Sequence, residues 1–290
     1  MSDAQSTFGP ATFRPATEET PLVRHLLIGS VLVVLALLLF APLVTVFHEA
    51  LRKGWWEAVS SLGDPEGLSA IRLTLTVAAI AVPLNATFGV AAAWFITKYD
   101  FRGKAVLLTL IDLPFSVSPV VVGLCLVLTF GANTWIGGLM DAGYPIVFAL
   151  PGIIAASMIV TFPFVARELI PVMVEQGRAE EEAALTLGAS GWRTFRTVTL
   201  PNIRWALLYG VLLCNARAMG EFGAVAVVCG KIRGQTATMP ITIEMLYNEY
   251  LPVAAFTLAA VLAFLAFLTL GLKTFLEIRH ADALAATRRH

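Results

Sequence analysis

Residues 175–201 read EQGRAEEEAALTLGASGWRTFRTVTLP, and this stretch decides how the rest of the chain is interpreted. Glutamates lead into a run rich in alanine and leucine, which favours a short helix with acidic residues in its first turn. Gly188 is placed to end that helix in the left-handed conformation. A second short helix through Trp192 and Val198 is expected next, and Pro201 suits the first turn of a third. The stretch therefore predicts a helical hairpin with exposed apolar side chains, which would fit a groove on another protein.

Long apolar segments flank the hairpin on both sides. The chain is 58% hydrophobic and only 14% charged, whereas a soluble domain carries about 25% charged residues. About 20 apolar residues are needed to cross a membrane as a helix. The qualifying segments are residues 26–47, 73–96, 105–130, 146–165, 205–229 and 253–275. Because backbone amides in lipid must be hydrogen-bonded within their own segment, an all-α protein with six transmembrane helices is expected. The first of these segments is too long for a cleaved signal peptide and is expected to remain as a membrane span.

The basic residues indicate which way these spans face. Fourteen of the 20 lysines and arginines lie in the two termini, the loop after the second span and the hairpin loop, and five lie in the alternate loops. Cytoplasmic loops carry the excess of positive charge. We therefore expect residues 1–24 and 277–290 to be cytoplasmic tails, residues 25–276 to form the transmembrane domain, and the hairpin loop, about 167–204, to face the cytosol.

The third span is interrupted by an acidic residue, two prolines and two serines, namely Asp112, Pro114, Ser116, Ser118 and Pro119. This pattern predicts a kink or a broken helix, which is tolerated at membrane depth where it is buried in protein or lines a wet cavity. Packing alone is the alternative explanation for the prolines. As lining groups, main-chain amides and the two hydroxyls would bind an anion weakly enough to release it.

The fifth span carries an arginine and a glutamate four residues apart, Arg217 and Glu221, beside Gly220 and Gly223. An arginine at the bilayer centre costs roughly 2.5–3.5 kcal/mol, so a buried partner is expected, and residues four apart share a helical face. Two interpretations stay open. The pair either lines the pathway as a gate, or clamps helices together without meeting the substrate.

The sequence indicates no catalytic, metal or nucleotide site on this chain. It has three scattered cysteines without a CxxC pair and no histidine cluster, so neither a disulfide framework nor a metal site is predicted. No phosphate-binding loop of the form G-x-x-x-x-G-K-[ST] occurs. The spans hold no nucleophile–base pair for an intramembrane enzyme. We predict no cofactor on this chain, and if ATP drives its activity, another chain must bind ATP and Mg²⁺ and hydrolyse the nucleotide.

The hairpin resembles the "EAA" loop of the MetI-like permeases of bacterial ABC importers. The matching residues are Glu182, Ala183, Ala184, Gly188, Val198, Leu200 and Pro201, with Val198 where isoleucine is commoner. In that family the loop forms a coupling helix that docks into a cleft of the ATPase subunit. The resemblance thus implies the permease fold, a role in transport rather than catalysis, and coupling to an ATPase through these residues.

Other stretches resemble the oxyanion branch of that family more specifically. They are residues 217–224, RAMGEFGA; residues 112–123, DLPFSVSPVVVG; residues 230–234, GKIRG; and residues 246–250, LYNEY. Together they are similar to the CysW-type permeases of sulfate/thiosulfate importers over residues 25–276. This implies translocation of sulfate or thiosulfate across a bacterial inner membrane. Its expected partners are an ATP-binding dimer, a homologous second permease, and a periplasmic binding protein docking on residues 49–69 and 230–252.

Two other transport functions remain open. A permease for another oxyanion, such as molybdate, would share most of these motifs. A secondary transporter driven by an ion gradient would need internal repeats and acids spaced for ion coupling. The chain shows no repeat, and Asp112 and Glu221 alone support that alternative thinly.

Overall fold

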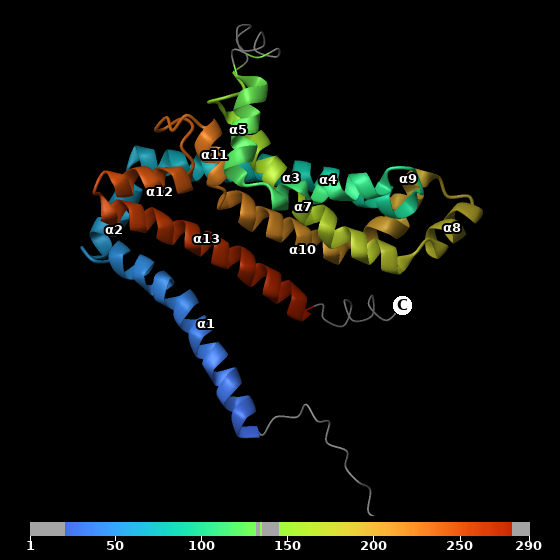
Figure 1. Ribbon diagram of the computed structural model, residues 1–290, viewed down its shortest axis with the longest axis horizontal. Coiled ribbons are helices and arrows are strands. Elements are labelled where there is room, and N and C mark those ends of the chain that lie inside the picture. Colours follow the sequence, from blue (N-terminus) through green and yellow to red (C-terminus); the bar gives the residue numbers. More distant parts are fainter. Residues whose placement is uncertain (1–20, 132–133, 135–144, 280–290) are drawn as a thin grey trace, which may run out of the picture. The chain divides into compact units, whose positions relative to one another are not determined.

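The computed structural model describes residues 21–131, 134 and 145–279, and every regular element within those residues is a helix (Figure 1). The predicted all-α class is therefore confirmed. The chain divides into two compact units, Met1–His48 and Glu49–His290, which are treated separately below.

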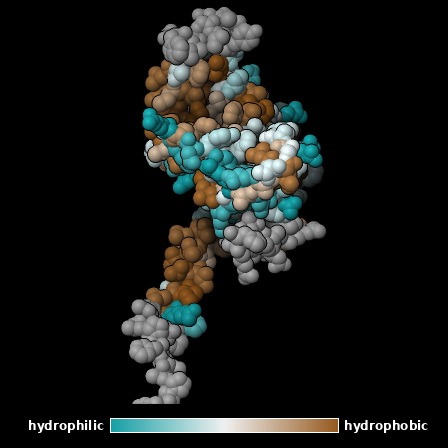
Figure 2. Space-filling view, turned by 90° about the vertical axis from the view of Figure 1, so that its right-hand side faces the viewer, coloured by the Kyte–Doolittle hydropathy of each residue, from teal (hydrophilic) through white to brown (hydrophobic). Residues whose placement is uncertain are grey.

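The first unit contains almost all of α1 (Pro21–Ala50). Residues Leu22–Ala50 are long and apolar enough to cross a membrane, and none of the most apolar window is buried. The space-filling view shows an almost continuous hydrophobic surface along this helix (Figure 2). Such a surface is suited to lipid or to an apolar protein partner. The predicted first span, residues 26–47, lies wholly inside α1.

The second unit holds the remaining helices. Their bounds are α2 (Trp55–Leu62), α3 (Pro65–Lys98), α4 (Lys104–Ser116), α5 (Pro119–Phe130), α7 (Leu150–Gln176), α8 (Ala179–Thr186), α9 (Gly191–Thr194), the π-helical turn η1 (Phe195–Thr199), α10 (Leu200–Met219), α11 (Gly223–Val228), α12 (Met239–Asn248) and α13 (Pro252–Arg279). Helices α3, α7 and α10 run alongside one another, with α8 and α9 at one end and α2 and α12 at the other (Figure 1).

Small and polar residues let α3 and α7 approach closely. Ala81, Asn85, Gly89 and Ala93 repeat at every fourth position of α3 and are all buried. The Asn85 side-chain amide donates to the Thr161 hydroxyl of α7 at 2.7 Å. Small residues and interhelical hydrogen bonds stabilise helix pairs in membranes, where lipid is as apolar as the helices. This stripe therefore holds the centre of the second unit together.

Gly89 provides the first testable prediction. A Cβ atom at Gly89 would lie 2.7 Å from the Val165 side chain and 3.2 Å from the Ala166 backbone nitrogen. We expect Gly89→Val to force α3 and α7 apart, at a cost of about 1–3 kcal/mol for overpacking. Gly271→Val is the matched control, because nothing lies within 4 Å of a Cβ there. Thermal stability in detergent should fall for the first variant only, and equal melting temperatures would contradict this packing.

The six predicted spans agree with the structure in number but not in every boundary. Among the described residues, five helices are long and apolar enough to cross a membrane, or six spans result if α4 and α5 count as one broken span. That pair bends by 108°, which confirms the predicted break in the third span.

Two helices end at residues that differ from the approximate span ends predicted above. The helix that contains the fourth span does not stop at residue 165, because α7 continues to Gln176 through charged residues that its helical backbone accommodates. The fifth does not reach residue 229, because α10 ends at Met219 and a new helix, α11, begins at Gly223. The predicted loops at 49–69 and 230–252 are also partly helical, since they contain α2 and α12.

Candidate functional site

Helix α8 forms the first arm of the predicted hairpin. Glu180, Glu181 and Glu182 occupy its first turn, where negative charge stabilises a helix. Gly188 has φ +86°, and its amide donates to the Leu185 carbonyl at 3.0 Å. The following amide, of Ala189, donates to the Ala184 carbonyl at 3.0 Å. These two bonds form a Schellman motif, so the predicted glycine stop is confirmed.

The second arm differs from the prediction. The Ser190 hydroxyl accepts from the Arg193 amide at 3.4 Å and caps the start of α9. Helix α9, the turn η1 and α10 then follow without a gap, so the chain is helical from Gly191 to Met219. The expected short second helix is therefore the beginning of one long helix. Pro201 interrupts nothing, because it lies in the first turn of α10 after the π-helical turn.

The hairpin exposes apolar side chains at its outer end. Leu187 is 89% exposed, Trp192 is 71% exposed, and α8 has no buried residue. In Figure 2 the end of the second unit that carries the hairpin faces the viewer and shows hydrophobic residues among hydrophilic ones. Glu182 and Ala183 are exposed and Ala184 is half-buried, whereas Val198 and Leu200 turn partly inward and Leu200 packs on the core. The exposed part is suited to contact with another protein.

The residues predicted to line the pathway lie where two broken helices meet. One break lies between α4 and α5, and the second between α10 and α11. A Cβ on Gly223 would lie 2.9 Å from Cβ of Pro119, and one on Gly123 would lie 2.6 Å from the Ala224 carbonyl oxygen. Only glycine permits so close an approach. The structure thus brings Pro119 and Gly223 together, and leaves Ser116 and Ser118 exposed at the first break.

Arg217 and Glu221 form an ion pair across the second break. Their nearest atoms are 2.5 Å apart, with the Arg217 side chain 36% exposed and that of Glu221 only 1% exposed. The other Glu221 carboxylate oxygen accepts from the Ala224 amide at 2.9 Å. The predicted pairing is therefore present, although not on one helical face, because the helix ends at Met219. Glu221 ties the end of α10 to the start of α11, while Arg217 keeps an accessible side.

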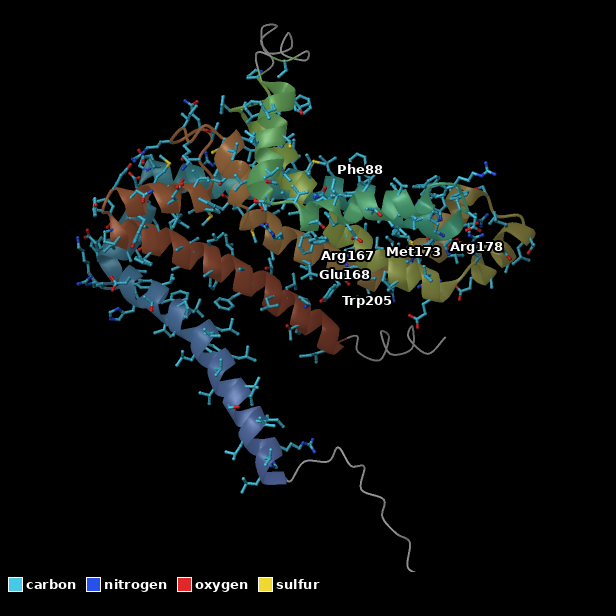
Figure 3. All side chains as sticks on the ribbon, viewed as in Figure 1. Phe88, Arg167, Glu168, Met173, Arg178 and Trp205 are labelled. Carbon is cyan, nitrogen blue, oxygen red and sulfur yellow. The ribbon has the colours of Figure 1, made fainter. Side chains whose placement is uncertain are left out.

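Asp112 makes no contact with the pair of Arg217 and Glu221 in the interactions that the structure shows, and has a different partner. It pairs with Arg167 of α7 at 3.4 Å, and both side chains are more than half exposed. The Arg167 guanidinium also lies 5.0 Å from the centre of the Phe115 ring (Figure 3). Sequence reasoning missed Arg167 because it assigned this residue to the cytosolic loop. The signal that could have predicted a basic partner was the position of Asp112, a charged residue inside an apolar segment. Pro114 lies half-buried one turn from the break.

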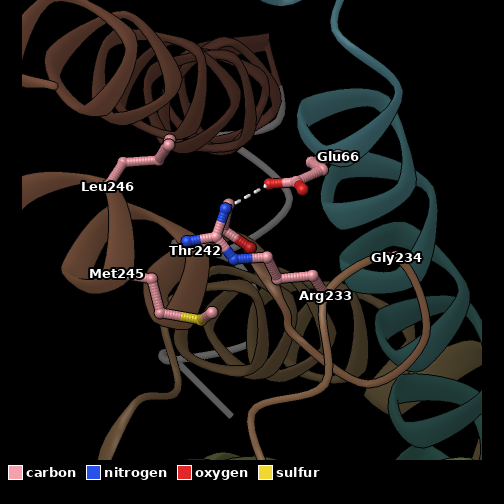
Figure 4. A pocket seen from close by; sticks show the side chains of 6 residues that line it. All are labelled: Glu66, Arg233, Gly234, Thr242, Met245 and Leu246. Atoms are coloured by element: carbon pink, nitrogen blue, oxygen red, sulfur yellow. Dashed lines mark hydrogen bonds and ion pairs between the residues drawn. The ribbon is translucent and has the colours of Figure 1, made fainter. Parts of the chain in front are cut away.

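The end of the second unit opposite the hairpin is bridged by Arg233. Its guanidinium pairs with Glu66 at 2.9 Å and with Glu249, while Lys231 pairs with Glu244 at 2.7 Å. Figure 4 shows Arg233 between the start of α3 and α12. A hollow of about 300 Å³ lies beside it. Residues 49–69 and 230–252, predicted to share one docking surface, are thus linked to each other.

Within the described part of the chain, no group of three or more histidine, cysteine or acidic side chains could hold a metal ion.

Comparison with known proteins identifies the family. Residues 85–279 match the binding-protein-dependent transport system inner membrane component family. The chain belongs to this family. It is accordingly a multi-pass membrane component of an ABC importer, and a transport subunit rather than an enzyme.

The proteins that this chain is similar to include sulfate permeases. The chain is 52% identical over 254 residues to the sulfate transport system permease protein CysW of Escherichia coli strain K12, covering 87% of each chain. It is 53% identical over 258 residues to CysW of Synechocystis, covering 89% of this chain and 94% of that one. The sulfate transport system permease protein CysT of Escherichia coli is more distant, at 35% identity over 81% of this chain and 85% of that one.

Solved structures agree on the fold. A chain of a bacterial alginate ABC transporter, crystallised with an alginate-bound periplasmic protein, superimposes with a TM-score of 0.72 over 89% of this chain and 96% of that chain. The two are 17% identical, so this similarity concerns the fold alone.

Proposed function

We propose that this chain is the permease subunit of an ATP-driven importer that carries sulfate or thiosulfate across a bacterial inner membrane. The observation that carries the proposal is the 52% identity to CysW, which extends over 87% of both chains. The 35% identity to CysT favours the CysW position in such an importer, with a CysT-like chain as the second permease.

The hairpin is proposed to bind the ATPase. Its exposed Leu187 and Trp192 offer an apolar knob, and the exposed Glu180 and Glu182 at the start of α8 add a polar rim. ATP and Mg²⁺ would be held by a dimer of that separate subunit, and the motion of the dimer would reach the membrane helices through the hairpin. Both chain termini and the hairpin would then face the cytoplasm, as the basic residues indicate.

The opposite end is proposed to meet the periplasmic binding protein. Residues 49–69 and 230–252 lie there together, joined by the pair of Arg233 and Glu66. Exposed aromatic side chains, Trp56 at 81% and Tyr250 at 91%, supply the kind of anchors that protein interfaces favour. Anion delivery at this end and ATPase docking at the other would give transport a direction.

The two broken helices are proposed to line the pathway. Pro119 and Gly223 bring the breaks together, and the exposed Ser116 and Ser118 hydroxyls can donate to a passing oxyanion. Arg217 would supply positive charge that Glu221 partly neutralises, so the anion would not be held tightly. Asp112, Pro114 and Gly220 would shape this region rather than bind.

Substrate competition tests the proposal. The complete importer, reconstituted in proteoliposomes with its binding protein, should take up radioactive sulfate only when ATP is supplied. Unlabelled thiosulfate should compete, whereas molybdate in equal amount should leave sulfate uptake nearly unchanged. Strong competition by molybdate with weak competition by thiosulfate would overturn the assigned substrate, and uptake that follows a proton or sodium gradient without ATP would overturn the ABC mechanism.

A further inference from the structure

Helix α8 lacks an apolar attachment to the rest of the second unit. No residue between Ala179 and Thr186 is buried, and Leu185 within the helix and Leu187 just after it are 51% and 89% exposed. Apolar packing therefore cannot fix the direction in which α8 points. Its orientation must come mainly from the polar contacts that its side chains and its two ends make.

The strongest of these contacts joins Glu181 to the end of α3. The Lys98 ammonium lies 3.0 Å from a Glu181 carboxylate oxygen, and the two side chains are only 8% and 16% exposed. The same ammonium donates to the Gly177 carbonyl at 2.5 Å, just before α8. A pair so shielded from water is expensive to break, because removing one partner leaves a buried charge. Lys98 thus holds both the start and the first turn of α8.

Glu181 also reaches the second arm of the hairpin. Its other carboxylate oxygen accepts from the Thr199 hydroxyl at 2.6 Å, and Thr199 is 3% exposed. Phe195 lies in the same π-helical turn, and its ring centre is 5.3 Å from that of Trp94 on α3. Both arms of the hairpin are therefore anchored on the last turns of α3. Arg178, which is labelled in Figure 3, adds an outer contact, to Asp100 at 3.3 Å.

The neighbouring glutamate behaves differently. Glu182, the glutamate of the family motif, is exposed, whereas Glu181 turns inward to Lys98. The two residues follow each other on one helix and so point in different directions. Glu182 is thus free to contact an outside partner, while the adjacent Glu181 contacts the membrane helices.

We infer that the Lys98–Glu181 pair is the mechanical link that passes movement of the hairpin to α3. This inference rests on the proposed function, since it assumes that a separate ATPase moves the hairpin. Coupling between distant sites needs stiff contacts that shift as a unit. Helix α3 is the longest described helix of the second unit and packs along α7 and α10, so a displacement of its end would be felt at both. Lys98 and Glu181 are positioning residues and do not touch the substrate.

The test compares transport with hydrolysis in the complete importer. Lys98→Met and Glu181→Gln each remove the ion pair with little change of shape. We expect the purified complex to retain its ATPase subunits, while sulfate taken up per ATP hydrolysed falls about tenfold. The charge-reversed double variant, Lys98→Glu with Glu181→Lys, should recover part of that ratio, although not the bond to Gly177. Glu175→Gln, an exposed residue in the last turn of α7, should match the parent.

Each outcome has a clear meaning. Single variants that keep the parental ratio, or a reversed pair no better than either single variant, would overturn the inference. Loss of the ATPase subunits, or of membrane insertion, would also overturn it, because the pair would then serve docking or folding. A parental complex that fails to use ATP for sulfate uptake would instead refute the proposed function, so the two failures are distinguishable.

Discussion

Replacing Gly188 with valine should leave the permease in the membrane but lower the amount of ATPase that co-purifies with it about tenfold or more. Gly188 has φ +86°, a conformation that a β-branched residue adopts only under strain. No atom lies within 4 Å of a Cβ placed there, so the effect comes from the backbone and not from a clash. Losing the Schellman bonds would swing Leu187, which is 89% exposed at the hairpin end, away from its present position.

Two control variants separate this effect from general damage. Asparagine tolerates the left-handed region, so Gly188→Asn should retain most ATPase binding. Gly191→Val also adds a β-branched side chain to the hairpin, at a helical glycine with open space around its Cβ. It should retain ATPase binding, because valine has a slightly higher helix propensity than glycine. If Gly188→Val retained a normal stoichiometry of ATPase, the hairpin would not be the docking element.

Replacing Arg217 with alanine should reduce sulfate uptake about a hundredfold while the complex still assembles. The change removes positive charge beside the two helix breaks and leaves the 1% exposed carboxylate of Glu221 without its ion-pair partner. A hundredfold fall in uptake corresponds to about 2.7 kcal/mol. Uptake assays and size-exclusion chromatography of the same preparation measure the two properties together.

A double variant distinguishes a pathway residue from a clamp. Arg217→Met with Glu221→Gln removes both charges, and the glutamine can still bond to the Ala224 amide. If the pair only clamps α10 to α11, uptake should return. We expect it to stay low, because the positive charge near the breaks would be missing. Uptake at the parental rate in Arg217→Ala would remove this residue from the pathway altogether.

The sequence predicts the local features of this protein well. Hydropathy locates the long helices, because crossing lipid requires a minimum apolar length. The stop at Gly188 is predicted for a local reason, since glycine itself favours the left-handed conformation that ends a helix and needs no distant contact to adopt it. The break at Pro119 is likewise predicted from residues within a few positions of it.

Contacts between segments far apart in the sequence could not be predicted from local sequence patterns. Asp112 meets Arg167 only when α4 packs on α7, and Lys98 meets Glu181 only when α8 packs on α3, and no spacing along the chain predicts either pair. Helix ends were misplaced for a related reason. Hydropathy measures what suits lipid, while α7 continues past its apolar part because its hydrogen bonds stay within the helix. Conversely, α10 ends inside an apolar run.

The most direct test is transport of sulfate against its concentration gradient, with and without the ATPase subunits. Proteoliposomes containing both permeases and the binding protein, with or without the ATPase subunits, are supplied with ATP and radioactive sulfate, and accumulation above the outside concentration is measured. The account predicts accumulation only in vesicles that contain the ATPase. Accumulation against a gradient by the permeases alone would contradict it.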